Sequence, residues 1–291
     1  MPALGILFAL SALLGWTFGD FFIQRGTRAV GNWRTLFYIG AMGGIFLFPF
    51  VYHEIIPAFQ RWNNAVIFGL LILITLFAAL FEFEALKRGK IAIIEPVFSI
   101  ELPVTVGLSL VLWKETLNVV QALLIFTVFV GIMLAVTINY SRLHYHKRIF
   151  EKGVVLAGIG AIGMALVNFM TGVGSQGTSP LVTIWVLNSG LSIICLIYLF
   201  WSGEIKQLLG DFRHHRNTVL ALSVFDNFAW ISFAFAARFI PISIATTISE
   251  SYIALTVLLG IFVNREKLKP HQFIGVALAI IGIIILSAIM S

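Results

Sequence analysis

The sequence predicts an all-α polytopic membrane protein, with ten transmembrane helices arranged as two inverted five-helix repeats. Three observations predict this fold: the composition, a series of apolar segments of membrane-spanning length, and a weak internal repeat. Of the 291 residues, 59% are hydrophobic and 11% are charged. Soluble domains average about 45–50% apolar and about 25% charged residues. The composition therefore excludes a water-soluble surface, a disordered chain and a small disulfide scaffold.

Charged and turn-forming residues divide the chain into ten apolar segments. A helix needs about 20 apolar residues to cross a bilayer, and each segment is near that length. Strands of a membrane barrel run about 10 residues with alternating polarity, whereas residues 277–286 form one continuous apolar run. Helices are therefore expected throughout. The segments are 3–22, 34–52, 65–86, 91–112, 119–137, 154–171, 180–201, 219–239, 241–262 and 271–289.

Individual segments carry further signals. No Lys or Arg precedes the first segment, so we interpret it as a retained helix and not as a cleavable signal peptide. The fourth segment contains Pro96 and Pro103, which remove two backbone donors and predict a kink. The longest connections, 139–153 and 202–218, are read as loops too short to hold a soluble domain.

An internal repeat relates the two halves of the chain. A shift of 151 residues aligns 85–136 with 236–287 and matches eleven of 52 pairs, including Glu115 with Glu266. A shift of 148 residues places Asp20 opposite Asn168. Five spans in each half, an odd number, require the second half to enter the membrane upside down, as in many secondary transporters. We therefore expect a repeat at 1–137, a basic linker at 138–152 and an inverted repeat at 153–291.

The basic residues predict the orientation, because Lys and Arg concentrate in cytoplasmic loops. The loops after the first, third, fifth, seventh and ninth spans hold 16 of the 19 Lys and Arg residues. We expect both termini outside, the linker in the cytoplasm, and a location in the plasma (inner) membrane. The net charge of +6 then reflects this orientation and attraction to anionic lipid, not nucleic-acid binding.

Few cofactor or metal sites are compatible with the sequence. The single cysteine, Cys195, excludes an intramolecular disulfide and a cysteine-built zinc site. No GxxxxGK[ST] loop for nucleotide binding occurs. We expect neither a cofactor nor a metal, and either a monomer or a homodimer.

A recurring pattern in both halves resembles a known family. The first copy reads Ala85-Leu86-Lys87, Ile94-Glu95-Pro96-Val97-Phe98, Lys114-Glu115-Thr116-Leu117 and Gly131-Ile132; the second reads Ala236-Ala237-Arg238, Arg265-Glu266-Lys267-Leu268 and Gly282-Ile283. This pattern is similar to the ten-helix EamA-type branch of the drug/metabolite transporter superfamily. The second copy departs from it, with Thr247 opposite Pro96. The resemblance implies alternating-access transport of small polar metabolites, often as export.

Two acidic residues near the middle of apolar segments are the leading site candidates. An ionisable side chain within a span costs about 2.5–3.5 kcal/mol on the insertion scale and marks a functional candidate. Glu101 and Glu250 lie near mid-depth in repeat-related segments, and we expect them to face a shared cavity and bind substrate or a coupling proton. Ser243, Thr247 and Glu250 share one helix face. The alternative is that both acids are structural hydrogen-bonding groups between helices.

Other polar and aromatic residues extend the candidate site. Trp185 and Asn188 belong to a polar stripe that would line a cavity or join helices, as Asn and Ser often do. The remaining candidates are Asp226, Trp230, Trp16, Asp20 and Tyr252. For Asp20, the alternative is a salt bridge with Arg25 or Arg28. For Glu82 and Glu84, pairing with Lys87 and Arg88 at the membrane interface is the favoured interpretation, and for Glu95 it is a helix-dipole role.

The sequence therefore predicts a secondary transporter of small polar or amphipathic metabolites, such as amino acids, amines or nucleobases. Acidic spans favour an amine-bearing substrate, export is expected, and protons are the candidate coupling ion. The alternative within the superfamily is a sugar or nucleotide-sugar carrier. From other classes, the alternatives are an intramembrane lipid-modifying enzyme, a receptor subunit and a channel. The absence of HExxH and GxSxG motifs and of a histidine at membrane depth counts against an enzyme.

Overall fold

The computed structural model describes residues 1–88, 91–136, 147–256 and 269–290. Within these ranges the regular structure is entirely helical, as expected, and nine stretches are long and apolar enough to cross a membrane. The helices are α1 (Pro2–Val30), α2 (Asn32–Phe59), α3 (Trp62–Arg88), α4 (Ile91–Phe98), α5 (Glu101–Val111), α6 (Val119–Val136), α7 (Lys147–Gly177), α8 (Pro180–Trp201), α9 (Ile205–Phe239), α10 (Ile242–Ser249) and α12 (Pro270–Met290). Together they correspond to an integral, multi-pass membrane protein.

Two expected spans are interrupted. The fourth, 91–112, is divided into α4 and α5 by turns at Ser99 and Ile100. Pro103 cannot donate to the carbonyl of Ser99, so the helical ladder loses a bond at this break. The ninth span, 241–262, ends its first helix at Ser249, and the part beyond residue 256 lies outside the described residues. The second copy of the motif at 265–268 also lies outside them.

The second break, after α10, has no proline to explain it, and hydroxyl side chains compete with the helical ladder instead. Thr247 Oγ1 donates to the Ser243 carbonyl at 2.7 Å, Ser249 Oγ to the Ala245 carbonyl at 2.8 Å and Ser251 Oγ to the Thr247 carbonyl at 2.7 Å. Such bonds to the carbonyl four residues earlier weaken and bend helices. Each half therefore carries one discontinuous helix.

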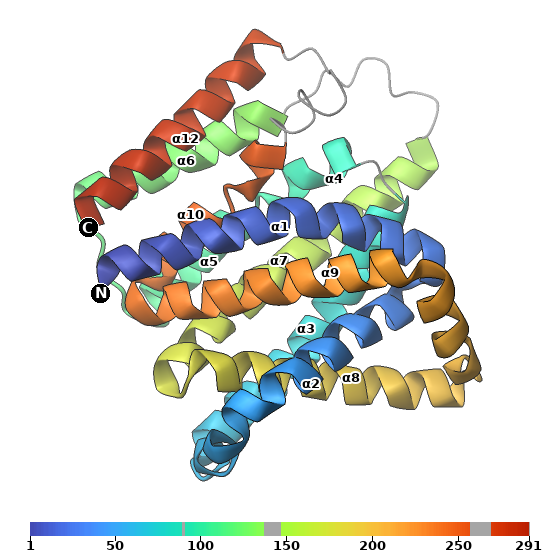
Figure 1. Ribbon diagram of the computed structural model, residues 1–291. Coiled ribbons are helices and arrows are strands. Elements are labelled where there is room, and N and C mark those ends of the chain that lie inside the picture. The colour runs from blue at the N-terminus through green and yellow to red at the C-terminus, as the bar shows by residue number, and fades with distance from the viewer. Residues whose placement is uncertain (89–90, 137–146, 257–268, 291) are drawn as a thin grey trace.

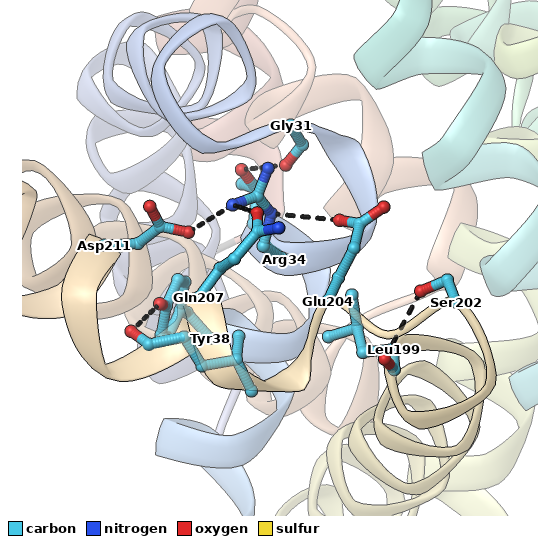
Figure 2. Close-up of polar contacts among 10 residues, drawn as sticks. Gly31, Arg34, Tyr38, Leu199, Ser202, Glu204, Gln207 and Asp211 are labelled. Carbon is cyan, nitrogen blue, oxygen red and sulfur yellow. Dashed lines mark hydrogen bonds and ion pairs between the residues drawn. The ribbon is translucent and has the colours of Figure 1, made fainter.

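The expectations of loops at 139–153 and 202–218 are wrong, because α7 already begins at Lys147 and α9 at Ile205. Helix α9 bends at His215, where φ is −114° and ψ is 22°. Figure 2 shows what holds the first part of α9: the Arg34 guanidinium of α2 pairs with Asp211, lies 3.4 Å from Glu204 and donates to Gln207 at 2.8 Å. These contacts depend on residues 170–177 positions away in the sequence, so no local pattern predicts the helix.

Helix packing follows a pseudo-twofold pattern. α1 packs along α9 and α7 packs along α3, while α2 packs on α8 and α6 on α12 (Figure 1). Matching glycines sit at the two equivalent crossings. A Cβ added at Gly15 would lie 2.7 Å from the Ala229 Cβ, and one added at Gly163 would lie 2.7 Å from the Ala78 Cβ. Small residues thus let the same pair of backbones approach closely in both halves.

The ends of the long helices define two faces of the molecule. Both chain termini lie at the same end, where α1 begins and α12 ends (Figure 1), and we name this the termini side. The ends of α7 and α9 and the start of α10 are also there, because Gln176 Nε2 donates to the Ala237 carbonyl at 2.8 Å. The opposite face, where α2, α9 and α7 begin, is the linker side.

Candidate functional site

A buried cavity lies between the two halves and is lined by five carboxylates. They come from five different segments; four of them are buried, with exposed fractions of 3–9%, and Glu82 is half-buried. The five are Asp20, Glu82, Glu101, Asp226 and Glu250. Four of them were predicted as site residues from the sequence. No Lys or Arg of the described residues lines the cavity.

The two helix breaks position the central acids. Glu101 is the first residue of α5, where the exposed backbone N–H groups of a helix start favour a negative side chain. Glu250 follows α10 directly, and its backbone N–H donates to the Thr246 carbonyl at 2.8 Å. Discontinuous helices near the bilayer midplane form the substrate sites of many transporters with inverted repeats. Here each break brings one carboxylate into the same cavity.

The acids form one electrostatic cluster. Glu101 is within electrostatic reach of Glu250, Glu82 and Asp20, and also of Glu95 on α4. Glu95 is buried, and neither of its carboxylate oxygens has a hydrogen-bond partner. Like charges at this proximity cannot all ionise in a medium of low dielectric constant. Shared protons or a bound cation would relieve this repulsion.

Hydrogen bonding leaves acceptors free at the centre of the cavity. Asn168 Nδ2 donates to Glu250 Oε1 at 3.0 Å. By contrast, Glu250 Oε2, Asn168 Oδ1 and Asp20 Oδ2 are buried without a partner. A buried unpaired acceptor costs free energy, which a ligand carrying N–H groups would recover. The centre of the cavity therefore suits a hydrogen-bond donor.

Aromatic rings form one wall of the cavity. The Trp16 ring lies 5.2 Å from the Trp230 ring at an interplanar angle of 81°, and 6.1 Å from the Tyr252 ring. These contacts join α1 and α9 to the segment after the α10 break. All three residues line the cavity, as predicted. Indole and phenol faces attract cations as well as apolar groups.

A polar clamp supports the opposite wall. Asn188 Nδ2 donates to Asn227 Oδ1 at 2.7 Å, and Asn227 Nδ2 donates to the carbonyls of Ile39 at 3.0 Å and Ser223 at 2.8 Å. This network ties α2, α8 and α9 together. Asn188 also lines the cavity. It therefore has both of the roles considered from the sequence: it lines the cavity and it joins helices.

Three predicted site residues are not among those that line the cavity. Trp185 Nε1 donates to the Gly44 carbonyl at 3.0 Å, so the indole joins α8 to α2. Thr247 Oγ1 bonds the Ser243 carbonyl within α10, and Ser243 lies nearer the termini side, where its backbone N–H donates to Glu115 at 3.0 Å. Residues that share a helix face still lie at different depths in the membrane, so only part of that face reaches the cavity.

The interpretation of Glu82 as an interfacial salt-bridge residue is wrong. Glu84 forms the expected pair with Arg88, while Glu82, two residues earlier, faces the cavity. Thr75, Ala79 and Glu82 all line it at the spacing i, i+4, i+7, a signal that the sequence contained. Asn168 was also missed as a lining residue, although the repeat placed it opposite Asp20.

The expected alternative for Asp20, pairing with Arg25 or Arg28, is not the arrangement found. Asp20 lines the cavity, whereas the Arg25 guanidinium lies 4.5 Å from the centroid of the Phe21 ring. Arg28 reaches the carbonyls of Leu86 and Lys87 at 3.4 Å. Among the residues that the structure describes, no group of three or more His, Cys, Asp or Glu side chains could hold a metal ion.

The fold and the buried acidic cavity between two halves define a polytopic membrane protein of the transporter type. A model of the EamA-like transporter family matches residues 3–137 and 151–288. The chain therefore belongs to the EamA-like transporter family, within the drug/metabolite transporter superfamily, as its resemblance implied.

Two further comparisons address sequence and fold. A search of the curated proteins gives no match for this sequence. A solved structure titled "Crystal structure of protein" is similar over 98% of this chain and 98% of its own, with 16% sequence identity and a TM-score of 0.71. At that identity the likeness concerns the fold alone.

Proposed function

We propose that this transporter moves small metabolites bearing a protonated amine, and that they exchange with protons at the acidic cavity. The observation that carries the proposal is the set of five cavity carboxylates without a lining Lys or Arg. An empty cavity has to keep several of these groups protonated, because unpaired buried charges are costly. An entering ammonium group would replace those protons. Competition of this kind couples substrate movement to proton movement in the opposite direction.

The aromatic wall favours a substrate with an apolar or cationic body. Trp16 and Trp230 present ring surfaces beside the carboxylates, which suits amino-acid derivatives, polyamines and cationic nucleobase-like compounds. A sugar could also stack on these rings, so sugars and nucleotide sugars are the second candidate class. Five cavity acids favour the amine, because a neutral sugar brings no positive charge to replace the protons that they hold.

Transport without chemical conversion is part of the proposal. Of the described residues that line the cavity, none is a histidine, cysteine, serine or lysine. Histidine is the side chain most often used as a general acid or base, and serine, cysteine and lysine are common nucleophiles. We propose that both termini lie outside, because 16 of the 19 Lys and Arg residues follow odd-numbered spans of the sequence. We propose export as the direction, as the family resemblance implies, and the plasma membrane as the location.

A thermal-shift screen of the purified protein tests the substrate class. A ligand that binds only the folded state raises its apparent stability. The panel contains putrescine, spermidine, amino acids and their methyl esters, nucleobases, nucleosides, sugars and nucleotide sugars. We expect amines to stabilise the wild type, Glu250→Gln and Glu101→Gln to lose at least tenfold in apparent affinity, and Glu54→Gln to retain it. Glu54 is an exposed acid of α2 outside the cavity.

Proton release tests the exchange. In weakly buffered solution near neutral pH, addition of a stabilising amine should acidify a pH indicator with the wild type and less so with Glu250→Gln. Amine binding without proton release would contradict the coupling and leave the substrate class standing. Stabilisation by sugars alone, unchanged in Glu250→Gln, would contradict the substrate class.

A further inference from the structure

The residues that line the cavity extend to different depths on different helices. On the linker side its lining includes Leu36, near the start of α2, and Phe83, near the end of α3. On α8 it includes Ile184, near the start of that helix, but on α7 and α10 it extends no closer to the termini side than Asn168 and Glu250, within the part of the chain that the structure describes. Between α7 and α10, the half of the path that leads to the termini side is closed in this conformation.

Two rows of polar residues cross that closed half. On α7, Asn168, Thr171 and Ser175 share one helix face at the spacing i, i+3, i+7, and they run towards the termini side. α10 carries a second row, formed by Glu250, Thr246 and Ser243 and described next. Both rows begin at the cavity, where the hydrogen bond from Asn168 to Glu250 joins them.

The row on α10 runs alongside the row on α7. Glu250, Thr246 and Ser243 share a face at the spacing i, i−4, i−7, and because α10 enters from the termini side they lead back towards it. A second contact keeps the helices together, since a Cβ added at Gly172 would lie 2.6 Å from an Ile242 side-chain carbon. The two rows therefore accompany each other from the cavity to the termini side.

The hydroxyl groups in these rows are unpaired. Thr171 Oγ1, Ser175 Oγ, Ser243 Oγ and Thr246 Oγ1 are buried and have no hydrogen-bond partner, and all four residues are fully inaccessible to solvent. Among the other described helical hydroxyls, those of Thr17, Thr75 and Ser249 bond the carbonyl four residues earlier, whereas those of Ser223 and Ser287 are also unpaired. A buried unpaired hydroxyl group is unfavourable. The packing of this conformation therefore does not explain why hydroxyl residues occupy these positions.

A set of contacts closes the termini-side end of the rows. Glu115 lies in the connection between α5 and α6. Its carboxylate accepts the backbone N–H groups of Ile242, at 2.6 Å to Oε1, and of Ser243, at 3.0 Å to Oε2. Arg238 Nη1 donates to the carbonyls of Ser175, at 3.3 Å, and Gln176. Trp113 Nε1 donates to Gln176 Oε1 at 2.8 Å. We name Trp113, Glu115, Gln176 and Arg238 the clasp; it links the first half of the chain to the second.

We propose that the facing rows of α7 and α10 form the termini-side branch of the transport pathway, and that the clasp is its gate. The inference rests on the proposed transport function and adds the route. When the clasp opens and the helices separate, Thr171, Ser175, Ser243 and Thr246 present hydroxyl oxygens to water and to a passing ammonium group. An uncharged, hydroxyl-lined branch lets such a cation leave the carboxylates without meeting a second strong binding site.

Cysteine accessibility tests the route without any substrate. The native Cys195 is fully buried and is replaced by Ala to give a background without cysteine. Ser175→Cys and Thr246→Cys are treated in proteoliposomes with a small cationic methanethiosulfonate reagent, which modifies only thiols that water reaches. We expect slow modification with an intact clasp and at least tenfold faster modification when Glu115→Ala is added.

The chain offers matched controls. Gly177→Cys is exposed on the termini side and has open space for its Cβ, so it should react at once in every background. Ile162→Cys lies on the face of α7 opposite Thr171, is 53% exposed in the isolated chain and should face lipid. It should therefore stay unreactive in every background.

The outcomes are distinct from those of the ligand screen. If Glu115→Ala leaves modification at 175 and 246 unchanged while Gly177→Cys reacts fully, the rows are packing surfaces and the proposal is wrong. Equal, rapid modification with the clasp intact would also overturn the gate. Arg238→Ala replaces Glu115→Ala if that variant does not elute as a monodisperse protein. A failed ligand screen changes none of these readouts.

Discussion

At the scale of single residues, Gly43 shows how a missing side chain permits the cavity wall. A Cβ at position 43 would overlap the Asn227 Oδ1 and Asn188 Nδ2 atoms of the polar clamp. The clamp can form only because the α2 backbone carries nothing there. This dependence concerns residues about 145 and 184 positions away from Gly43 along the chain, which is why no sequence pattern indicated it.

Gly43→Ala should therefore destabilise the protein by about 1–3 kcal/mol, the usual cost of overpacking a filled interior. The measurement is the apparent unfolding temperature of the detergent-purified protein. Gly69→Ala is the control, since a Cβ at Gly69 meets nothing within 4 Å, and alanine is the better helix former. An equal unfolding temperature for both variants would contradict the role of Gly43.

At the scale of elements, breaks and bends within helices place the cavity residues, and these interruptions fall where the apolar sequence predicts unbroken helices. The breaks after α4 and α10 deliver Glu101 and Glu250 to one cavity. The bend at His215 separates the first turns of α9 from its membrane part, and the Arg34 contacts of Figure 2 hold those turns against α2. Tyr38 Oη adds a hydrogen bond to the Leu208 carbonyl at 2.6 Å.

Arg34→Ala should release the first turns of α9. Loss of the guanidinium removes contacts to Glu204, Gln207 and Asp211 together, and such half-buried networks contribute more than an isolated surface pair. We expect trypsin to cut at Lys206, Arg213 or Arg216 several-fold faster than in the wild type. Arg61→Ala, which removes an exposed arginine before α3, is the control. Equal cleavage of the two variants would show that other contacts hold the segment.

At the scale of the whole molecule, pseudo-twofold packing builds the site. The crossings of α1 with α9 and of α7 with α3 use matching Gly–Ala contacts, and the cavity lies where the two halves meet. Such symmetry makes two alternative conformations, open to opposite faces, close in energy, which is the basis of alternating access. In this conformation, the clasp contacts hold the termini-side ends of α7, α9 and α10 together.

Orientation in the membrane is the prediction that belongs to this scale. Gly177 and Gly210 are both exposed with open space for a Cβ, on the termini side and the linker side respectively. With Cys195→Ala as background, Gly177→Cys should react with an impermeant maleimide in intact cells, and Gly210→Cys only after permeabilisation. The reverse pattern would place both termini in the cytoplasm, against the distribution of basic residues.

Much of the fold could be predicted from the sequence because the bilayer imposes a local rule. Every backbone polar group in the membrane needs an internal partner, so a long apolar segment has to be helical. The expected segment 180–201 coincides with α8, and 119–137 differs from α6 by one residue. The first half of α9 escaped prediction because its residues are polar and its helix depends on Arg34.

The candidate site was predictable only in part. Charge within an apolar segment marked Glu101, Glu250, Asp20 and Asp226, because the cost of an intramembrane carboxylate makes each one conspicuous. Glu82 was missed because nearby basic residues offered a simpler partner. For Trp185, Ser243 and Thr247, the sequence indicates the helix face but neither the depth of that face in the membrane nor its neighbouring helices.

By itself, the sequence determined that the chain is a ten-segment helical membrane protein with related, opposed halves, because hydropathy and repeat spacing are local and cumulative properties. The tertiary structure decided which carboxylates share a cavity, which hydroxyls stay unpaired and which helix ends are held together. Those features depend on contacts between residues far apart in the chain, such as Asn168 with Glu250 and Glu115 with Ser243. Only the packing of helices fixes such distances, and the periodicity of one helix carries no information about its neighbour.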